Sequence, residues 1–501
     1  MYLTDDHSST ESYDIAIPGA SAMLESLRAF GYNIQTAIAD LIDNSISARA
    51  RNVWLNFCWD GRDSYIVIKD DGHGMTEAEL IRAMRPGSQN PIDNRNSDDL
   101  GRFGLGLKTA SFSQCRRLTV ASRSESQEIA TRRWDLDYIS QVNEWRLLHF
   151  PAAESLPRLN ELQDMTHGTI VLWECLDRVV GEANVNDQKA HNEFLEAIEI
   201  VEQHLAMVFH RFLEQRQFLN IWINQHPVTP WNPFLLVAQA TQILPVEILS
   251  FNGGNIYIQP YILPHHSKID MDTYKNASGM NGWTAQQGFY VYRNSRLLVA
   301  GDWLGLGYQS DEHCKLARIQ IDLPNSMDND WNIDVKKSRA RPPVALKSDL
   351  KRIARLTRQR AIDIYRHRGK VIARKYGDCI FTWERKIRQG KVFYAVNREH
   401  PLVQEVLHFP EQFQSAVKAL LKLLEETVPV QQIWIDSSAE PEKETQAFDG
   451  SPSEEVTEVM FQVYLALRKN GLTQEQAQDR ILRMEPFQHF PFLVQNLADQ
   501  L

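Results

Sequence analysis

The sequence predicts an α+β protein, because stretches with helical and with strand-like spacing of apolar residues alternate along its 501 residues. Apolar side chains recur at helical spacing from Ile34 to Ile42, and they alternate as in a strand from Val53 to Phe57. The polar stretch SSAEPEKETQAFDGSPS at residues 437–453 is typical of a linker and sets a small C-terminal module apart. We therefore expect a mixed fold built in several parts.

The same patterns give the order of the elements. Helices are predicted around Asp40 and at residues 20–30, 76–84, 109–114, 192–214 and 346–365. Strands are predicted at residues 53–57, 65–68, 118–122, 169–173, 219–223, 255–262, 288–292 and 318–323. Thr76 and Glu79 have the spacing of a capping box. Residues 85–100, RPGSQNPIDNRNSDDL, predict a long loop that we expect to act as a lid.

Composition limits the class of protein. With 43% hydrophobic and 24% charged residues, the chain resembles a soluble globular protein of roughly three domains. No apolar run reaches the ~20 residues that a membrane-spanning helix needs, and the polar start MYLTDDHSST is unlike a signal peptide. The five cysteines form no C-x-x-C pair, so they predict neither a zinc cluster nor a disulfide framework. We expect an intracellular protein, cytoplasmic or, in a eukaryote, nuclear, without a membrane partner.

Charge is distributed unevenly along the chain. The net charge is −10, yet residues 336–391 contain 19 lysines and arginines against 4 aspartates and glutamates, a net of +15. The rest of the chain therefore carries −25. One interpretation of the basic segment is a DNA-binding patch that neutralises phosphates without reading sequence. The other is a helix that docks through its apolar stripe and leaves its cations in water or facing the acidic N-terminal part.

The stretch IADLIDNS, residues 38–45, carries the first candidate site. Asp40, Asp43 and Asn44 stand at positions i, i+3 and i+4 of the predicted helix, so their side chains share one face. Two acids and an amide beside an apolar stripe are costly to bury without partners. They are therefore either solvated or hold a ligand such as a metal ion and an activated water.

Two glycine-rich turns follow at intervals of about 25 residues. The strand at 65–68 runs into Asp70-Asp71-Gly72-His73-Gly74-Met75, and residues 101–108 read GRFGLGLK before a predicted helix. Glycines let a backbone approach a ligand closely, and the free N–H groups of a helix start favour phosphate. Each pattern alone is more typical of an ordinary turn, and neither a dinucleotide fingerprint nor a P-loop is present. The order and spacing of the three pieces carry the signal.

Together these motifs resemble the GHKL ATPases, a family that includes gyrase B subunits, ninety-kilodalton heat-shock chaperones, MutL, MORC proteins and histidine kinases. DNS on the helix is similar to the gyrase and MORC form, and GRFGLGLK to the chaperone form. The resemblance covers roughly residues 14–345 and looks most like MORC-type proteins and their bacterial relatives. It implies a Bergerat-fold ATPase domain, with helices on a mixed sheet. The histidine kinase branch fits poorly, because residues 1–13 are too few for a phosphoacceptor helix.

The resemblance implies a role for each matching residue. Asp40 would be the general base that activates the attacking water, and Asn44 would bind Mg²⁺. Asp70 would accept a hydrogen bond from the adenine amino group of ATP. The other residues implied to contact the nucleotide are Gly72, Gly74, Met75, Arg102, Phe103, Gly104, Leu105, Gly106, Leu107, Lys108 and Thr169. Asp40 stands where gyrase-like and MutL-like members have glutamate, so a non-hydrolysing nucleotide switch stays open as an alternative.

The stretches QGFYVYRNSRLLVAGDWLG and ARIQIDLPNSMDNDWNIDVKKS resemble the ribosomal-S5-like transducer domain of the gyrase, MutL and MORC branch. In that branch a transducer lysine reaches the γ-phosphate. Lys337 is the favoured candidate here, with Lys336 as the other. A solvated Lys-Lys pair is the plain alternative. A mobile point charge suits the sensing of a γ-phosphate.

The sequence thus predicts five parts: an ATP-binding domain at 1–180, a transducer domain at 181–345, a basic helical region at 346–436, the linker, and a helical module at 454–501. The resemblance implies slow ATP hydrolysis and an ATP-driven homodimer that gates a clamp on DNA or a DNA-associated partner. The basic segment 336–391 would contact DNA, and the C-terminal module is a candidate protein-docking part. A protein-remodelling chaperone of the heat-shock type is the alternative function.

Overall fold

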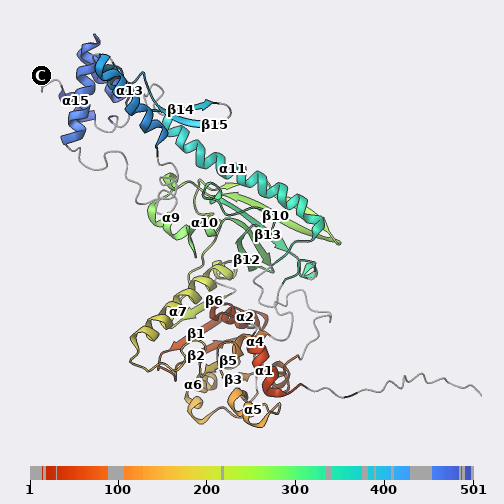
Figure 1. Ribbon diagram of the computed structural model, residues 1–501. Coiled ribbons are helices and arrows are strands. Elements are labelled where there is room, and N and C mark those ends of the chain that lie inside the picture. The colour runs from red at the N-terminus through yellow and green to blue at the C-terminus, as the bar shows by residue number, and fades with distance from the viewer. Residues whose placement is uncertain are drawn as a thin grey trace, which may run out of the picture. The chain divides into compact units, whose positions relative to one another are not determined.

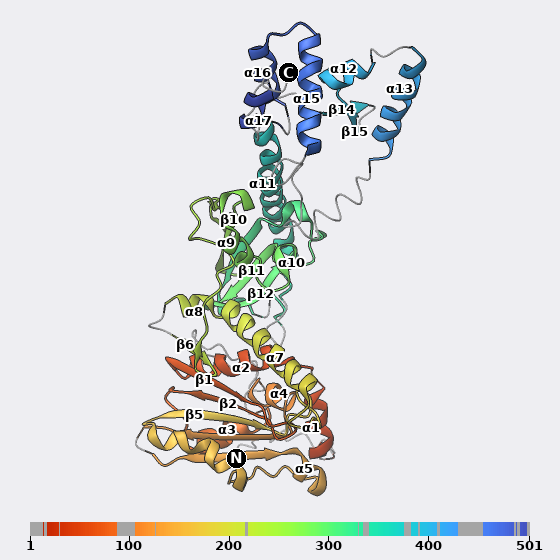
Figure 2. The same cartoon turned by 90° about the vertical axis from the view of Figure 1, so that its left-hand side faces the viewer.

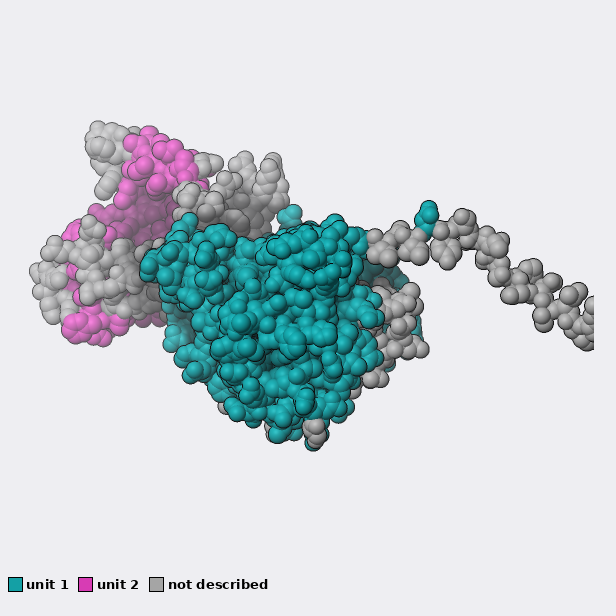
Figure 3. All heavy atoms as spheres, turned by 90° about the horizontal axis from the view of Figure 1, so that it is seen from below, with its two compact units in different colours: residues 1–363 teal, residues 364–501 magenta. Residues whose placement is uncertain are grey.

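The computed structural model describes residues 14, 18–29, 31–87, 106–125, 127–215, 219–328, 330–333, 340–374, 382–388, 391–407, 411–428, 454–484, 487 and 491–497. The chain forms two compact units, residues 1–363 and residues 364–501 (Figure 3). Within the first unit we call residues 18–227, which contain one sheet, the first region, and residues 242–363, which contain another, the second region. The finer division into five parts stays a prediction.

The first region is a mixed sheet covered by helices. Its seven strands lie in the order β4-β3-β5-β2-β1-β6-β7, and β1 pairs parallel with β6 while its pairing with β2 is antiparallel. The strands are β1 (Asn52–Cys58), β2 (Tyr65–Asp70), β3 (Arg117–Arg123), β4 (Ala130–Asp135), β5 (Gly168–Glu174), β6 (Asn220–Ile223) and β7 (His226–Pro227). The helices are α1 (Ala20–Arg28), α2 (Ile34–Ser47), α3 (Glu77–Met84), α4 (Gly106–Phe112), α5 (Leu136–Val142), α6 (Leu156–Leu159), α7 (Gln188–Val208) and α8 (His210–Glu214).

Alternation along the strands sends side chains to two separate cores. Ile66 and Ile68 of β2 join the main core, which lies under α1, α2, α4 and α7 (Figures 1 and 2). Val67, between them, joins a smaller cluster on the other face of the sheet with Leu159 and Leu162. The helices on a mixed sheet confirm the predicted α+β class and Bergerat arrangement.

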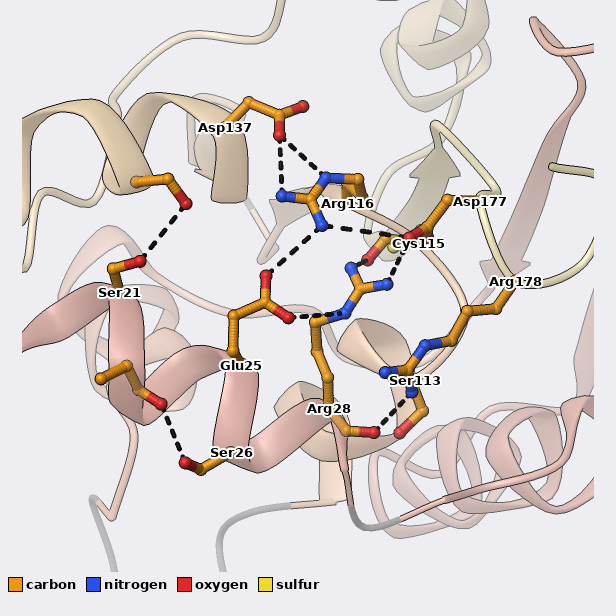
Figure 4. A network of polar contacts seen from close by, with 12 residues as sticks. Ser21, Glu25, Ser26, Arg28, Ser113, Cys115, Arg116, Asp137, Asp177 and Arg178 are labelled. Carbon is orange, nitrogen blue, oxygen red and sulfur yellow. Dashed lines mark hydrogen bonds and ion pairs between the residues drawn. The ribbon is translucent and has the colours of Figure 1, made fainter. Parts of the chain in front are cut away.

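A polar network fastens α1 to the edge of the main core (Figure 4). The buried guanidinium of Arg28 lies 2.5 Å from a carboxylate oxygen of Asp177 and 3.5 Å from Glu25. Arg116, the residue before β3, forms an ion pair with Asp137 at 2.7 Å and one with Glu25 at 3.4 Å. These contacts fix the end of α1, and therefore the chain that leads from it into α2.

The second region has its own sheet, in the order β12-β11-β13-β10-β8, with β9 also paired to β10. β11 runs parallel to β13 and antiparallel to β12. Its strands are β8 (Gln242–Ile243), β9 (Glu247–Phe251), β10 (Gly254–Ile262), β11 (Gly288–Arg293), β12 (Arg296–Asp302) and β13 (Ala317–Leu323). Its helices are α9 (Met271–Ala277), α10 (Gly282–Ala285) and the start of α11 (Lys347–Arg374).

Helix α11 carries most of the basic segment, and its described side chains divide by face. Leu350, Ile353 and Ala354 are buried. Arg358 lies 4.8 Å from the ring centroids of both Trp303 and Tyr308, so part of its charge rests on aromatic surface of the second region. The exposed cations on the other side are Lys347, Lys351, Arg352, Arg355 and Arg360. The helix therefore docks through its apolar stripe and still presents positive charge to water.

The second unit contains a hairpin and a set of helices. The predicted basic helical region does contain helices, but it also includes an antiparallel strand pair that the sequence interpretation did not expect. The elements are β14 (Trp383–Arg388), β15 (Lys391–Val396), α12 (Pro401–Leu407), α13 (Glu411–Glu426), α15 (Glu454–Lys469), α16 (Gln474–Leu482) and α17 (Pro491–Asn496). Leu402 of α12 packs against the core of α15, α16 and α17, so the module at 454–501 shares a core with the helix before the linker.

Two further differences from the predicted elements concern the first unit. The predicted helix at 192–214 divides into α7 and α8 at Phe209, whose φ of −105° and ψ of 14° leave the helical range. The strands and α-helices of the first unit that were not predicted at all are strands β4, β7, β8, β9 and β12 and helices α5, α6, α9 and α10. Among the described residues, no helix is both long enough and apolar enough to cross a bilayer.

Candidate functional site

Helix α2 organises the candidate site. Asn33 caps its start by accepting a hydrogen bond from the N–H of Thr36, and Ile38, Leu41 and Ile42 fix one side in the main core. The acids predicted to share a face are both buried, Asp40 at 3% exposure and Asp43 at 0%, whereas Asn44 is exposed. The helix therefore presents an amide to water next to two buried carboxylates.

Asp40 is held by a side chain that the sequence interpretation missed. The hydroxyl of Tyr32 donates to Oδ2 of Asp40 at 2.9 Å, and the side chain of Gln114 donates to the backbone carbonyl of Tyr32 at 2.9 Å. Tyr32 lies just after α1, which the Arg28 network anchors. The hydroxyl thus helps to orient this buried carboxylate.

Asp43 is bound from the other sheet. Nε of Arg296, at the start of β12, lies 3.1 Å from both carboxylate oxygens of Asp43, and its terminal nitrogen lies 3.9 Å from Oδ1 of Asp40. The two partners are 253 positions apart in the sequence. A guanidinium from the second region therefore balances the acidic cluster of the first.

Asp70, at the end of β2, is a further buried acid, and it contacts the same helix, α2. Ser45 of α2 donates to one of its oxygens at 2.9 Å, and the N–H of Gly72 donates to the other at 2.9 Å. Burial raises the pKa of Asp70 to about 6, although both hydrogen bonds lower it. Since the charged form is held only by neutral donors, this carboxylate keeps capacity for a further polar partner.

The turn after Asp70 fits closely against neighbouring backbone. Gly74 has a φ of +67°, and an added Cβ would lie 1.9 Å from the carbonyl oxygen of Arg123, so only glycine fits. The N–H of Met75 donates to Oγ of Ser122 at 2.9 Å, and the same hydroxyl lies 2.8 Å from Oγ1 of Thr169. Thr169 stands directly opposite Asp70 in the β2–β5 pairing.

The start of α4 lies beside Asp40. A Cβ built on Gly106 would be 3.7 Å from Oδ2 of Asp40, which brings the end of the glycine-rich stretch to the acidic helix. Leu107 packs against the main core. Lys108 is 2% exposed, and its ammonium donates to the carbonyl of Ala83 at 2.8 Å. Burial lowers the pKa of Lys108 to about 8. In this structure Lys108 therefore binds the end of α3 and does not point into open space.

Several predicted site residues lie outside the described part of the chain. They are Arg102, Phe103, Gly104 and Leu105 of the glycine-rich stretch, the lid at 88–100, and both lysine candidates, Lys336 and Lys337. Asp40 and Gly106 are brought together, as are Asp70, Met75 and Thr169. Both groups touch α2, at positions five residues apart, or about 7.5 Å along the helix.

The residues present fit a magnesium ion that a ligand carries in. Among the described residues, no group of three or more histidine, cysteine, aspartate or glutamate side chains could hold a metal. Mg²⁺ typically keeps several waters and takes one or two protein oxygens together with substrate phosphates. Asn44, exposed on α2 beside the two acids, offers an amide oxygen of this kind.

Three further residues near the site were not predicted, and they differ in whether the sequence carries a signal for them. Ser45 belongs to the same DNS motif as Asn44, so the motif could have indicated it as a site residue. In the structure it donates to Asp70. Ser122 is the last residue of a predicted strand, so it could have been considered as a polar residue of the site. Arg296 carries no local signal, because it begins a strand that was not predicted and its partner lies in the other region.

Comparison with known proteins agrees with this geometry. Residues 32–169 match the family described as "Histidine kinase-, DNA gyrase B-, and HSP90-like ATPase". That range begins at the tyrosine that binds Asp40 and ends at the threonine opposite Asp70.

The chain is also similar to three characterised proteins. It is 31% identical over 90 residues to "ATPase morc-1" of Caenorhabditis elegans, which covers 18% of this chain and 10% of that protein. It is 28% identical over 115 residues to the DNA mismatch repair protein MutL of Dictyoglomus turgidum, covering 22% and 20%. Against MutL of Buchnera aphidicola it is 31% identical over 97 residues, covering 19% and 16%.

These matches span at most a fifth of the relatives' own lengths, so they concern a part of each relative and not a whole protein. The three motifs, their meeting on α2 and the matched range all concern the same sheet and helices. Residues 32–169 of this chain are thus similar to the histidine kinase-, DNA gyrase B- and HSP90-like ATPase family, and this match coincides with the site on α2.

Proposed function

We propose that this chain binds ATP with Mg²⁺ along α2 and hydrolyses it. The observation that carries the proposal is the meeting of three separate motifs on one helix: Gly106 beside Asp40, and Asp70 bonded to Ser45. Nucleotide would extend from the turn at Asp70 to the start of α4. The match to an ATPase family over the same residues supports this assignment.

Asp70 would select adenine. A carboxylate accepts hydrogen bonds when ionised, and the pKa of about 6 keeps Asp70 mainly ionised at pH 7.5. Neutral partners occupy one position on each of its oxygens, which leaves acceptor sites for the adenine amino group. Thr169 and the backbone of Gly74 and Met75 would complete this end of the site.

Asp40 would accept the proton of the attacking water. Tyr32 orients its carboxylate, and a correctly placed general base contributes roughly 10²–10⁴-fold to a rate. Mg²⁺, held by Asn44 and the phosphates, would neutralise charge that develops on the phosphate oxygens. Because the aspartate side chain is one methylene shorter than glutamate, we expect turnover to be slow.

The direct test measures ATP binding by calorimetry and phosphate release in the same preparation. We expect ATP to bind with Mg²⁺ and to bind more weakly in EDTA. Asn44→Ala should lose most of the Mg²⁺-dependent affinity, whereas Asn192→Ala, at another exposed asparagine on a helix, should not. Absence of ATP binding by the wild-type protein would refute the proposal. Binding without phosphate release would leave a nucleotide switch.

We further propose that ATP drives dimerisation and a grip on DNA. Lys337, on the segment between β13 and α11, would contact the γ-phosphate, as the resemblance to transducer domains implies. A ligand shifts an equilibrium only through contacts that differ between the two states, so ADP should not support closure. The exposed cations on α11, which include Lys351 and Arg355, support a sequence-independent contact with DNA phosphates.

Sedimentation velocity and a salt series of DNA binding test this second proposal. A non-hydrolysable ATP analogue should produce a dimer at micromolar protein and change the DNA affinity, and ADP should do neither. A monomer in both nucleotide states would contradict the clamp. A dimer without DNA binding would favour a protein-remodelling role instead.

A further inference from the structure

The β11–β12 hairpin places two buried arginines on either side of one tight turn. Arg293 and Arg296 face each other in the strand pairing, and Asn294 and Ser295 between them have φ values of 46° and 66°. A two-residue turn with both φ values positive fits the twist of a hairpin and holds its ends firmly. Both guanidiniums are 3% exposed, so their charges need partners within the protein.

Their partners lie in different regions. Arg293 pairs with Asp328 at 3.1 Å, inside the second region. Arg296 instead reaches across to α2, where its Nε lies 3.1 Å from both oxygens of Asp43. Its NH1 donates to the carbonyl of Leu297 at 2.9 Å, which fixes the direction of the guanidinium. One turn therefore carries one internal ion pair and one that joins the regions.

The contact to α2 concerns the proposed catalytic acid as well. The terminal nitrogen of Arg296 lies 3.9 Å from Oδ1 of Asp40, while Tyr32 occupies Oδ2. Asp40 and Asp43 are one helical turn apart and both buried, so two negative charges there disfavour each other. The guanidinium supplies positive charge to both, and it lies nearer to the oxygen of Asp40 that Tyr32 does not bond.

A cavity of about 700 Å³ lies beside this contact. It is bordered by Thr36 of α2 and His204 of α7 from the first region, and by Arg296 and Asp302 from the second. Desolvation, with the charge of Arg296 as a smaller cause, lowers the pKa of His204 to about 3, so this histidine adds no positive charge at pH 7. The two regions are therefore not close-packed beside the Arg296 contact.

We propose that Arg296 is a positioning residue that couples the placement of the second region to the competence of Asp40. This inference rests on the proposed ATPase function. While the hairpin lies against α2, the charge of Asp43 is balanced and the carboxylate of Asp40 is held between a hydroxyl and a guanidinium. When the second region moves, Asp40 loses the contact with Arg296. A misplacement of about 1 Å at a reacting group can cost ~10²-fold in rate.

The test compares Arg296→Gln with Arg293→Gln. Both substitutions remove a buried guanidinium from the same turn, but only the first breaks the contact with α2. We expect Arg296→Gln to lower kcat by roughly tenfold to a hundredfold, with the Kd for a non-hydrolysable ATP analogue changed less than about threefold. Arg293→Gln should keep kcat within about threefold of wild type. In a double-mutant cycle, Asp43→Asn should add little to Arg296→Gln, because both break the same contact.

Equal kcat in the two arginine variants would overturn the inference, as would a parallel loss of nucleotide affinity in Arg296→Gln. If that variant does not fold, Arg296→Lys and Arg293→Lys replace the pair, since lysine keeps the charge but not the planar fork. Analogue-induced hydrogen-exchange protection of residues 34–47 is a second readout and needs no turnover. It should fall only in the Arg296 variant, and equal protection in both would also overturn the inference. A wild-type protein that binds no ATP would refute the proposed function instead.

Discussion

The first region buries a cluster of acids around α2, whereas the sheet of the second region buries a set of arginines. Around α2 the first region buries acids, namely Asp40, Asp43 and Asp70, each at 7% exposure or less. The second region buries arginines, among them Arg293, Arg296 and Arg318, each at 3% or less. Arg318 has local partners, since it donates to the hydroxyl of Tyr290 and lies near the rings of Trp283 and Tyr290. The comparison shows that most of these buried charges have partners within their own region. The Arg296 contact is different, because it joins the candidate site on α2 of the first region to strand β12 of the second.

The acids themselves differ in what holds them. Asp70 is held by a hydroxyl and a backbone N–H, and burial raises its pKa to about 6. Asp43 is held by a full positive charge. A carboxylate with neutral partners keeps capacity for a ligand, whereas one that is charge-paired is already committed. This contrast supports the proposed role of Asp70 in nucleotide binding, while Asp43 links the two regions through Arg296.

The largest expected effect comes from Asp40, which is neither the acid held by neutral donors nor the acid that links the two regions. Asp40→Asn should lower phosphate release by roughly 10²–10⁴-fold, because the amide cannot accept the proton of water. The Kd for ATP should stay within about threefold of wild type, since Asp40 is not assigned to binding. Asp60→Asn, at an exposed acid in the β1–β2 turn, is the control and should match wild type. Wild-type turnover in Asp40→Asn would remove the general base from the account.

Gly74 and Gly87 allow a comparison within the first region between a glycine packed against neighbouring backbone and a glycine with open space around it. Gly74 and Gly87 have φ values of +67° and +66°, but a Cβ at Gly74 would meet backbone at 1.9 Å while one at Gly87 meets nothing within 4 Å. The left-handed backbone alone costs about 1–2 kcal/mol for alanine. We expect Gly87→Ala to lose about that much unfolding free energy and Gly74→Ala to lose at least ~3 kcal/mol, together with ATP binding. Equal losses in urea unfolding would show that the turn at Asp70 is not tightly fitted.

Asp70→Asn tests whether the charge of Asp70, which is held by a hydroxyl and a backbone N–H, lowers the free energy of unfolding. The folded pKa of about 6 lies above the ordinary value of 3.8, so the folded state binds a proton that the unfolded state releases between these values. Asp70 therefore destabilises the fold at pH above 6, by up to about 3 kcal/mol, and this cost fades as the pH falls toward 4. We expect Asp70→Asn to be more stable than wild type by about 1–3 kcal/mol at pH 8, with the gain shrinking at pH 5. A gain that does not depend on pH would contradict the assignment.

The smallest expected effect on stability concerns the exposed cations of α11. Lys351→Glu with Arg355→Glu should change unfolding free energy by less than about 1 kcal/mol, because both side chains are exposed on a docked helix. The same pair should weaken DNA binding severalfold at low salt and reduce the salt dependence. Arg62→Glu with Lys189→Glu makes the same charge change at exposed sites of the first region and is the control. Equal DNA affinity in both doubly substituted proteins would leave α11 as a docked structural helix.

Local patterns were enough to predict most of the first region. Helical spacing located α2, and a capping box that the structure forms between Thr76 and Glu79 located α3. The turn at Asp70 contacts α2 through Ser45, and Thr169 lies opposite Asp70, so these parts of the predicted site lie close together. These features depend on residues a few positions apart, or on a motif whose spacing is known.

What could not be predicted depends on long-range contacts. Arg296 begins a strand that has no strong alternation, and its acidic partners lie more than 250 positions away. The orientation of Lys108 depends on where α3 ends, because its ammonium binds the carbonyl of Ala83. The break between α7 and α8 at Phe209 likewise follows from packing and has no glycine or proline to mark it. Spacing alone identifies which side chains share an element, but not which element they meet.

The central claim is that ATP lies along α2 with its adenine at Asp70. Calorimetric titration of wild type and Asp70→Asn with Mg²⁺ and a non-hydrolysable ATP analogue at pH 7.5 tests it most directly. A hydrogen bond to a charged group contributes about 1.5–3 kcal/mol, so the variant should bind roughly tenfold to a hundredfold more weakly. It should do so while being at least as stable as wild type in thermal unfolding, which separates lost binding from lost folding. Wild-type affinity in Asp70→Asn would contradict the claim and move the nucleotide away from this turn.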